Sequence, residues 1–289
     1  MADIVSSLRY LFADIIGERD GTPPLPPDGL PEAAGPLVID GIALLVAYQG
    51  AGYARLYVDR LRRFMDKPGV DAAMLCDIAR LMAMRMSYED PIRIAQLKLA
   101  ELANGRAQPG VEVRKFRFDE LIGALPAKGA NPMLTALGKA GWSHRHVSVR
   151  FSTKSRPGIR RLKVEAAMRR GRLFSVRYEE ERRWVERWLH MIGRCLDKQP
   201  QSASAIVATA TMVQGYGDVY RQGLADWHAI IDGLAKPVFD GALPLSDLPA
   251  AITEARAAAR PDRRQTALKR AIAEIRARAL DAAANAAAG

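Results

Sequence analysis

Apolar residues recur at every third or fourth position through most of this chain, and that spacing is typical of amphipathic α-helices. The pattern runs through Leu37–Met65, residues 71–87, Asp90–Asn104, Tyr178–Leu196 and Asp218–Leu234. Short turns separate several of these segments, so neighbouring helices should pack antiparallel. The sequence therefore predicts a mainly α fold, a multi-helix bundle.

The helical spacing changes between residues 105 and 155. Val111–Phe118 and His146–Phe151 alternate apolar and polar residues, which is the pattern of a strand with one buried face. A short helix from Pro132 to Lys139 is expected between them. We therefore predict a small two-stranded β element inserted among the helices.

The chain divides into three expected segments. Residues 1–35 comprise a short amphipathic helix over residues 2–17 and a Pro-rich linker over Gly21–Gly29. Residues 36–240 form the helical domain with its β insertion, and residues 241–289 form a C-terminal helical tail. Prolines restrict the backbone, so the linker should be a stiff spacer or a strap lying on the domain, in preference to an SH3-type ligand.

Positive charge is concentrated in one stretch of the sequence. The formal net charge is +11, and residues 145–194 contain fifteen Lys or Arg against five Glu and no Asp. Such a field attracts anions, whether nucleic acid, acidic proteins, phosphorylated ligands or an anionic membrane. The candidate anion-binding or partner-docking residues are Arg145, His146, Arg156, Arg160, Arg161, Lys163, Arg169, Arg170, Arg183 and Arg187.

A second group of polar residues begins at a predicted helix start. Tyr88 precedes Asp90, a natural N-cap before Pro91, and Arg93 follows one turn later. This group could line a polar site, or it could be a capping turn with a local ion pair, and the second interpretation is favoured. Tyr216 and Asp218 are further candidates for a polar site.

Other chemistry-bearing patterns are weak. Gly215, Gly217 and Gly223 do not have dinucleotide-loop spacing, so a helix kink or a close helix contact is the better interpretation. Trp184 and Trp188 are spaced as core residues. No catalytic or metal-binding motif is recognised, and two distant cysteines argue against a disulfide or cluster scaffold. With neither a signal peptide nor a membrane span expected, a cytoplasmic location is predicted.

Three segments resemble a known family. Ile78–Lys98, with its turn Ser-Tyr-Glu-Asp-Pro, is similar to a segment near the C-terminal end of indolepyruvate ferredoxin oxidoreductases. Gly41–Arg60 and Val213–Gly223 are similar to neighbouring segments of the same family. The resemblance covers about residues 36–240 and is closest to the C-terminal helical region of β-subunit-like 2-oxoacid oxidoreductases.

The resemblance implies membership of an enzyme assembly. The family oxidatively decarboxylates aryl pyruvates to acyl-CoA with thiamine diphosphate and iron–sulfur clusters, and passes the electrons to ferredoxin. This chain departs from it at Gly217-Asp218, where Val219 follows and no thiamine motif is completed, and it has no cysteine run for clusters. Both cofactors are therefore expected only in partner subunits.

The leading hypothesis is a helical accessory or assembly domain of such an oxidoreductase. It would dock a catalytic subunit or an acidic ferredoxin through its basic face and would not be catalytic alone. The alternative is an independent basic nucleic-acid-binding helical protein, although no helix-turn-helix, RRM or KH pattern is recognised.

Overall fold

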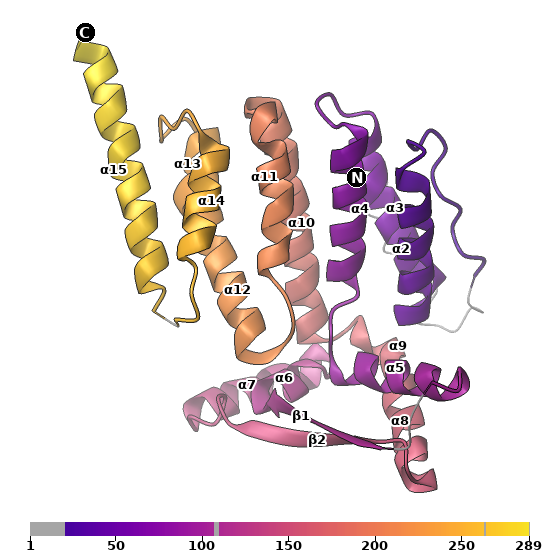
Figure 1. Ribbon diagram of the computed structural model, residues 1–289. Coiled ribbons are helices and arrows are strands. Elements are labelled where there is room, and N and C mark those ends of the chain that lie inside the picture. The colour runs from indigo at the N-terminus through magenta and orange to yellow at the C-terminus, as the bar shows by residue number, and fades with distance from the viewer. Residues whose placement is uncertain (1–20, 107–109, 263, 289) are drawn as a thin grey trace. The chain divides into compact units, whose positions relative to one another are not determined.

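The computed structural model describes residues 21–106, 110–262 and 264–288, and they form a mainly α protein with one two-stranded sheet (Figure 1). The predicted fold class is confirmed. The helix expected over residues 2–17 lies outside the described residues. Contacts divide the chain into two compact units: the first contains Met82–Val185 and the described residues up to Asp66, and the second contains Lys67–Leu81 and the residues from Glu186 onward. The three segments expected from the sequence stay a prediction.

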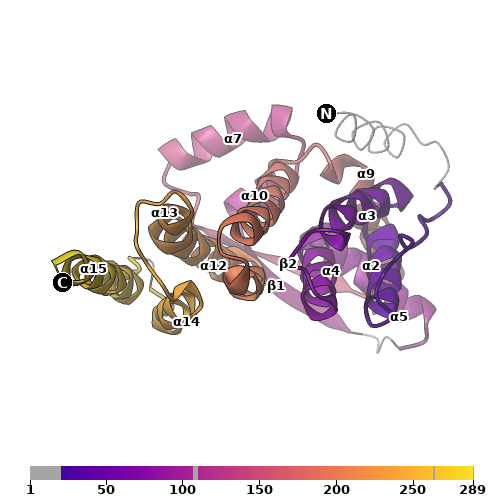
Figure 2. The ribbon, with the colours of Figure 1, turned by 90° about the horizontal axis from the view of Figure 1, so that it is seen from above.

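The first unit begins with two helices where one was expected. Helices α2 (Ala34–Tyr48) and α3 (Ala51–Met65) are separated at Gly50, whose φ of 133° is not accessible to most residues. The prediction of a single helix over residues 37–65 is therefore wrong. The two helices pack against each other (Figure 2), and a Cβ on Gly41 would lie only 2.8 Å from the Tyr57 hydroxyl oxygen.

The next two helices follow the expected pattern. Helix α4 spans Ala72–Met86, with its C-terminal end in the first unit, and α5 spans Pro91–Ala103. Asp90 caps α5, because its Oδ1 accepts a hydrogen bond of 2.6 Å from the Arg93 N–H. The capping signal in the sequence is thereby confirmed.

The expected β element is an antiparallel ribbon. Strand β1 (Val111–Arg117) pairs with β2 (His146–Ser152), with α6 (Phe118–Gly123) and α7 (Ala127–Lys139) between them. Phe116 and Phe151 are buried on one face of the ribbon with their ring centroids 6.4 Å apart. The alternating pattern therefore predicted the strands because one face packs against the unit and the other does not.

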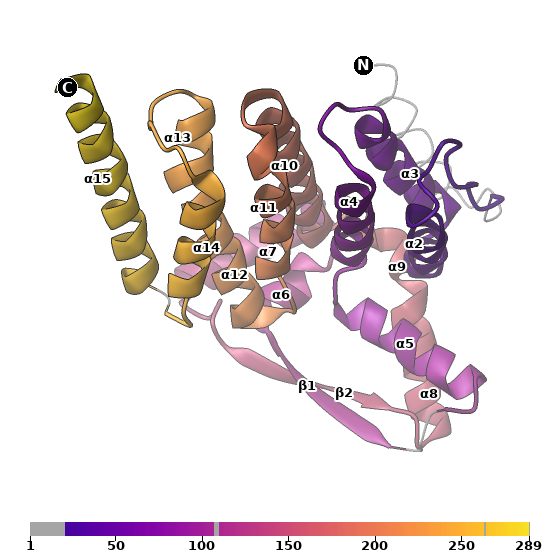
Figure 3. The same ribbon diagram turned by 45° about the horizontal axis from the view of Figure 1, so that its top comes forward.

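Helices close the first unit. Helix α8 (Arg156–Ala167) packs against α5 (Figure 3) and is followed by α9 (Arg169–Arg172). The N-terminal part of α10 (Val176–Lys198) completes the unit. Ser155 caps α8 by accepting a 3.2 Å hydrogen bond from the Gly158 N–H.

The second unit is built from the rest of α4 and α10 and the helices that follow them. Those helices are η1 (Pro200–Ser202), α11 (Ala203–Ala208), η2 (Thr209–Met212), α12 (Gly217–Ile230), the π-helical η3 (Ile231–Ala235), α13 (Lys236–Phe239), α14 (Leu248–Ala258) and α15 (Thr266–Ala288). Trp188 and Trp227 are fully buried, and their indole N–H groups donate to Ile206 O at 3.3 Å and to Thr209 Oγ1 at 3.0 Å. Trp184, in the first unit, is also buried. The prediction that Trp184 and Trp188 are core residues is therefore confirmed.

The glycines near residue 217 make backbone contacts. Gly215 and Gly217 have φ values of 69° and 68°, in the left-handed region that favours glycine. A Cβ added to Gly223 in α12 would collide with the carbonyl oxygen of Met212. Of the two interpretations made from the sequence, a helix kink or a close helix contact, the close contact is confirmed at Gly223, whereas Gly215 and Gly217 lie at the start of α12 and kink no helix.

We expect Gly223→Ala to destabilise the second unit by about 1–3 kcal/mol, because backbone atoms must move to admit the methyl group. Urea unfolding followed by circular dichroism measures this change. Gly129→Ala in α7 is the matched control, since nothing lies within 4 Å of its added Cβ and alanine favours helix. Equal stability of the two variants would contradict the prediction.

Candidate functional site

Helix α8 presents a row of exposed cations. Arg156, Arg160 and Lys163 are separated by four and three residues, and this spacing places them on one side of the helix. None of them forms an ion pair with the residues that the structure describes. We call these three residues the α8 stripe. Arg170, exposed on α9, continues the positive charge along the chain.

The α8 stripe has an apolar neighbour. Val164 follows Arg160 by one helical turn and is 66% exposed, and Met168 follows one turn later with 45% exposed. Large apolar side chains beside cations on an exposed helix are typical of surfaces that contact another molecule. The stripe therefore combines charge with apolar contact area.

Other cations of the predicted basic face are already paired. Arg161 binds Glu165 at 2.7 Å and Arg183 binds Glu179 at 3.1 Å. Arg187, which belongs to the second unit, pairs with Asp232 and lies 2.8 Å from His228 Nδ1. Burial and the nearby Arg187 lower the pKa of His228. Positive charge in this stretch is thus partly neutralised by local carboxylates.

The remaining predicted cations lie in several settings. The Arg145 guanidinium stacks on Trp142, 4.9 Å from the ring centroid, and His146 opens β2. Arg169 is half-buried, and its carbonyl oxygen accepts a 2.9 Å hydrogen bond from the Gln49 side chain. Within the first unit, the predicted cations therefore differ in exposure and in pairing.

The polar site expected around Asp90 is a buried ionic cluster. Arg172, only 1% exposed, donates to the two carboxylate oxygens of Asp90 at 2.7 and 2.9 Å. It also donates to Tyr48 O at 3.0 Å and to the Gln49 side chain at 3.2 Å. We call Arg172, Asp90, Tyr48 and Gln49 the Arg172 cluster. It joins the end of α2, the start of α5 and α9.

Aromatic rings surround the Arg172 cluster. The guanidiniums of Arg172 and Arg93 lie over the Tyr48 ring, 4.0 and 5.6 Å from its centroid, and Tyr88 packs edge-on at 5.7 Å. The hydroxyls of Tyr48 and Tyr88 are buried with no hydrogen-bond partner among the described residues. Burial raises the pKa of both phenols, so they stay protonated at neutral pH.

Sequence reasoning identified Tyr88, Asp90 and Arg93 but not the partner of Asp90. Arg172 lies 82 residues away and was one arginine among many in the basic stretch. No local pattern distinguishes Arg172, because its burial depends on the interruption between α2 and α3 at Gln49–Gly50 and on its contacts with Tyr48 and Gln49 there. The expected capping turn is present, but Asp90 pairs with the distant Arg172 and does not form the local ion pair that was expected.

A second buried ionic group lies in the first unit. Glu181 of α10, 2% exposed, binds Arg85 of α4 at 2.7 Å and Arg177 at 2.9 Å. Arg85 lies over the Trp184 ring at 5.1 Å, and Arg177 over the Tyr88 ring at 5.6 Å. We call Glu181, Arg85 and Arg177 the Glu181 cluster. It binds α4 to α10.

Tyr216 and Asp218 belong to the second unit. Tyr216 precedes α12 and Asp218 lies in its first turn, where a carboxylate is favoured by the helix dipole. Tyr88, Asp90 and Arg93 belong to the first unit. The helix start at residue 218 accounts for the acidic side chain there.

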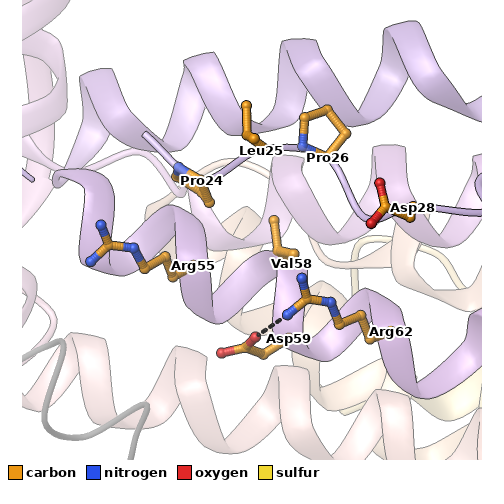
Figure 4. Close-up of a pocket in the computed structure, with 8 residues that line it drawn as sticks. All are labelled: Pro24, Leu25, Pro26, Asp28, Arg55, Val58, Asp59 and Arg62. Atoms are coloured by element: carbon orange, nitrogen blue, oxygen red, sulfur yellow. Dashed lines mark hydrogen bonds and ion pairs between the residues drawn. The ribbon is translucent and has the colours of Figure 1, made fainter. Parts of the chain in front are cut away.

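A pocket of about 420 Å³ lies between the Pro-rich linker and α3 (Figure 4). The Thr22 carbonyl oxygen of the linker accepts a 3.0 Å hydrogen bond from Arg55. Inside the pocket, Asp59 and Arg62 pair at 3.2 Å. The linker is therefore a strap lying on the first unit, which is one of the two arrangements expected from the sequence.

The described residues contain few candidates for metal or thiol chemistry. In the part of the chain that the structure describes, no three His, Cys, Asp or Glu side chains are grouped to hold a metal ion, and no helix has the length and apolar character to cross a membrane. Cys76 and Cys195 are both free thiols. Burial raises the pKa of Cys195 to about 12, which makes its thiol a poor nucleophile.

The fold and the site define a mainly helical protein with an exposed cationic helix beside a buried ionic cluster. Residues 34–233 match the Family of unknown function (DUF6537), and because this is more than half of the chain, the protein belongs to that family. No curated protein and no solved structure matches the chain.

Proposed function

We propose that this protein is a helical accessory part of an indolepyruvate-type 2-oxoacid:ferredoxin oxidoreductase, and that it docks an acidic partner through the α8 stripe. The observation that carries the docking proposal is the stripe itself, Arg156, Arg160 and Lys163, exposed and without ion pairs in the described residues. The partner would be a catalytic subunit or an acidic ferredoxin. Thiamine diphosphate and iron–sulfur clusters would belong to partner subunits.

The buried cluster supports the same proposal. The resemblance to the oxidoreductase family is carried by residues 78–98, and that segment contains Asp90, which binds Arg172 of α9. Because α9 directly follows α8, the Arg172 cluster anchors the C-terminal end of the helix that carries the stripe. A rigidly held row of charges loses less conformational entropy on binding than a mobile one.

The apolar edge of the stripe favours a protein partner over a small anion. Val164 and Met168 offer contact area that a free phosphate would leave exposed. Cations on an interface steer an acidic partner and set its orientation, while apolar contacts hold it. A protein with a carboxylate-rich surface and an apolar centre has both features.

The test is recovery of partners with the tagged chain from its native host. We expect a thiamine-dependent subunit or a ferredoxin to co-purify with it. Changing Arg156, Arg160 and Lys163 to glutamate should lower that recovery about tenfold or more, because each exposed ionic contact contributes roughly 0.5 kcal/mol. Quantitative mass spectrometry measures the recovery.

The matched control reverses three exposed cations elsewhere in the first unit, Arg106, Lys128 and Lys139. It changes the net charge by the same amount and should leave recovery unchanged. Absence of both a thiamine-dependent subunit and a ferredoxin from the wild-type sample would refute the assembly proposal. Equal losses in the two variants would refute the role of the stripe.

A further inference from the structure

The β1–β2 ribbon has an outer face that the unit does not cover. The register pairs Val113 with Arg150 and Lys115 with Ser148, and residues paired directly in an antiparallel ribbon share a face. Phe116 and Phe151 point the other way and are buried. Val111 and Val113 are 52% and 51% exposed. The outer ribbon face consists of the exposed residues Val111, Val113, Lys115, His146 and Arg150 with Ser148 between them. At the end of this face Arg117, opposite His146, is buried and pairs with Asp119 at 2.9 Å.

The outer ribbon face carries positively charged side chains and no exposed acidic residue. Lys115 and Arg150 are exposed, and neither forms an ion pair with the residues that the structure describes. None of the exposed residues of the outer ribbon face is acidic, and Glu112 lies on the opposite side of the strand. These two unpaired cations, on an extended ribbon, can contact the phosphates of a polynucleotide.

An exposed tryptophan stands next to the end of the ribbon. Trp142 is 51% exposed, and the turn that carries it leads into β2 at His146. The turn is held in place, since the Arg145 N–H donates to Trp142 O at 3.0 Å and the Phe118 N–H donates to Arg145 O at 2.8 Å. The Arg145 guanidinium lies over the indole ring, 4.9 Å from its centroid, and the ring remains 51% exposed, so an unpaired base can stack on its exposed part.

We propose that the outer ribbon face and Trp142 together bind single-stranded nucleic acid. This goes beyond the proposed docking function and uses residues outside the α8 stripe. Cations would contact the phosphates, Val111 and Val113 would contact sugars or bases, and Trp142 would stack on a base. Stacking on Trp142 needs an unpaired base, which favours a single strand over a duplex, and an acidic peptide would not use the indole face in this way.

The test is fluorescence anisotropy of the full chain with a labelled single-stranded oligonucleotide of mixed sequence. Trp142→Ala should weaken binding about 5- to 150-fold, the range seen for loss of one stacked base. Changing Lys115 and Arg150 to glutamine should reduce the slope of log affinity against log salt by about 1.4, because each phosphate contact to a single strand contributes about 0.7.

Changing Lys128 and Lys139 of α7 to glutamine is the control, since it removes the same charge and should leave both affinity and slope within error. Circular dichroism melting shows that each variant is folded. No binding at low salt, a Trp142→Ala variant that binds as well as wild type, or a duplex of equal length bound as tightly as the single strand would each overturn the proposal. Displacement by poly-glutamate that is unaffected by Trp142→Ala would assign the face to an acidic protein instead.

Discussion

Replacing Arg172 with alanine should destabilise the first unit by about 3–5 kcal/mol. The change leaves Asp90 buried without its two hydrogen bonds from the guanidinium, and an uncompensated buried charge is costly. It also removes the donor to Tyr48 O. Urea unfolding measures the effect, and Arg170→Ala, two residues away on the surface, is the control expected to change stability by less than about 0.5 kcal/mol.

Asp90 offers a sharper dissection of the same cluster. Asn is a good N-cap, so Asp90→Asn keeps the cap of α5 while it removes the charge that Arg172 binds. Combining Asp90→Asn with Arg172→Ala should cost clearly less than the sum of the two single changes, because both remove one interaction. Additive costs, or an Arg172→Ala variant as stable as Arg170→Ala, would show that the buried pair is not the anchor of α9.

Replacing Glu181 with alanine should cost a similar amount, about 3–5 kcal/mol. The change leaves Arg85 and Arg177, both largely buried, without this carboxylate. Glu179→Ala is the matched control on the same helix, because its pair with Arg183 is exposed and such pairs contribute at most about 0.5 kcal/mol.

Thermal unfolding followed by circular dichroism ranks the two glutamate variants, and hydrogen exchange locates the effect. Loss of protection should appear first in α4 and the start of α10, which the Glu181 cluster joins. If Glu181→Ala and Glu179→Ala unfold at the same temperature, the Glu181 cluster contributes little to stability and packing alone holds α4 and α10 together.

Local sequence signals predicted much of the secondary structure. The period of three to four residues identified the helices, and Asp90-Pro91 marked the start of α5. The period of two residues identified β1 and β2, because Phe116 and Phe151 alternate with residues that face outward. These patterns act over a few residues and need no knowledge of the rest of the chain.

Features that depend on contacts between distant residues were not predicted from the sequence. The helical spacing of apolar residues continues across Gly50, so the sequence predicted one helix over residues 37–65. The structure shows two helices, α2 and α3, that pack against each other. The sequence alone does not distinguish the cations of residues 145–194 from one another. Packing separated them into a buried one, Arg172, several that pair with carboxylates, and the few that form the α8 stripe.

The sequence by itself determined that this protein is helical, that a short ribbon interrupts the helices, and that its positive charge lies in one stretch. Periodicity and composition are local properties, and they are sufficient for such statements. Only the tertiary structure decided which charges are available to a partner. Burial and pairing depend on residues far apart in the chain, such as Asp90 and Arg172, and the free energy of a charge depends on whether water or another residue surrounds it.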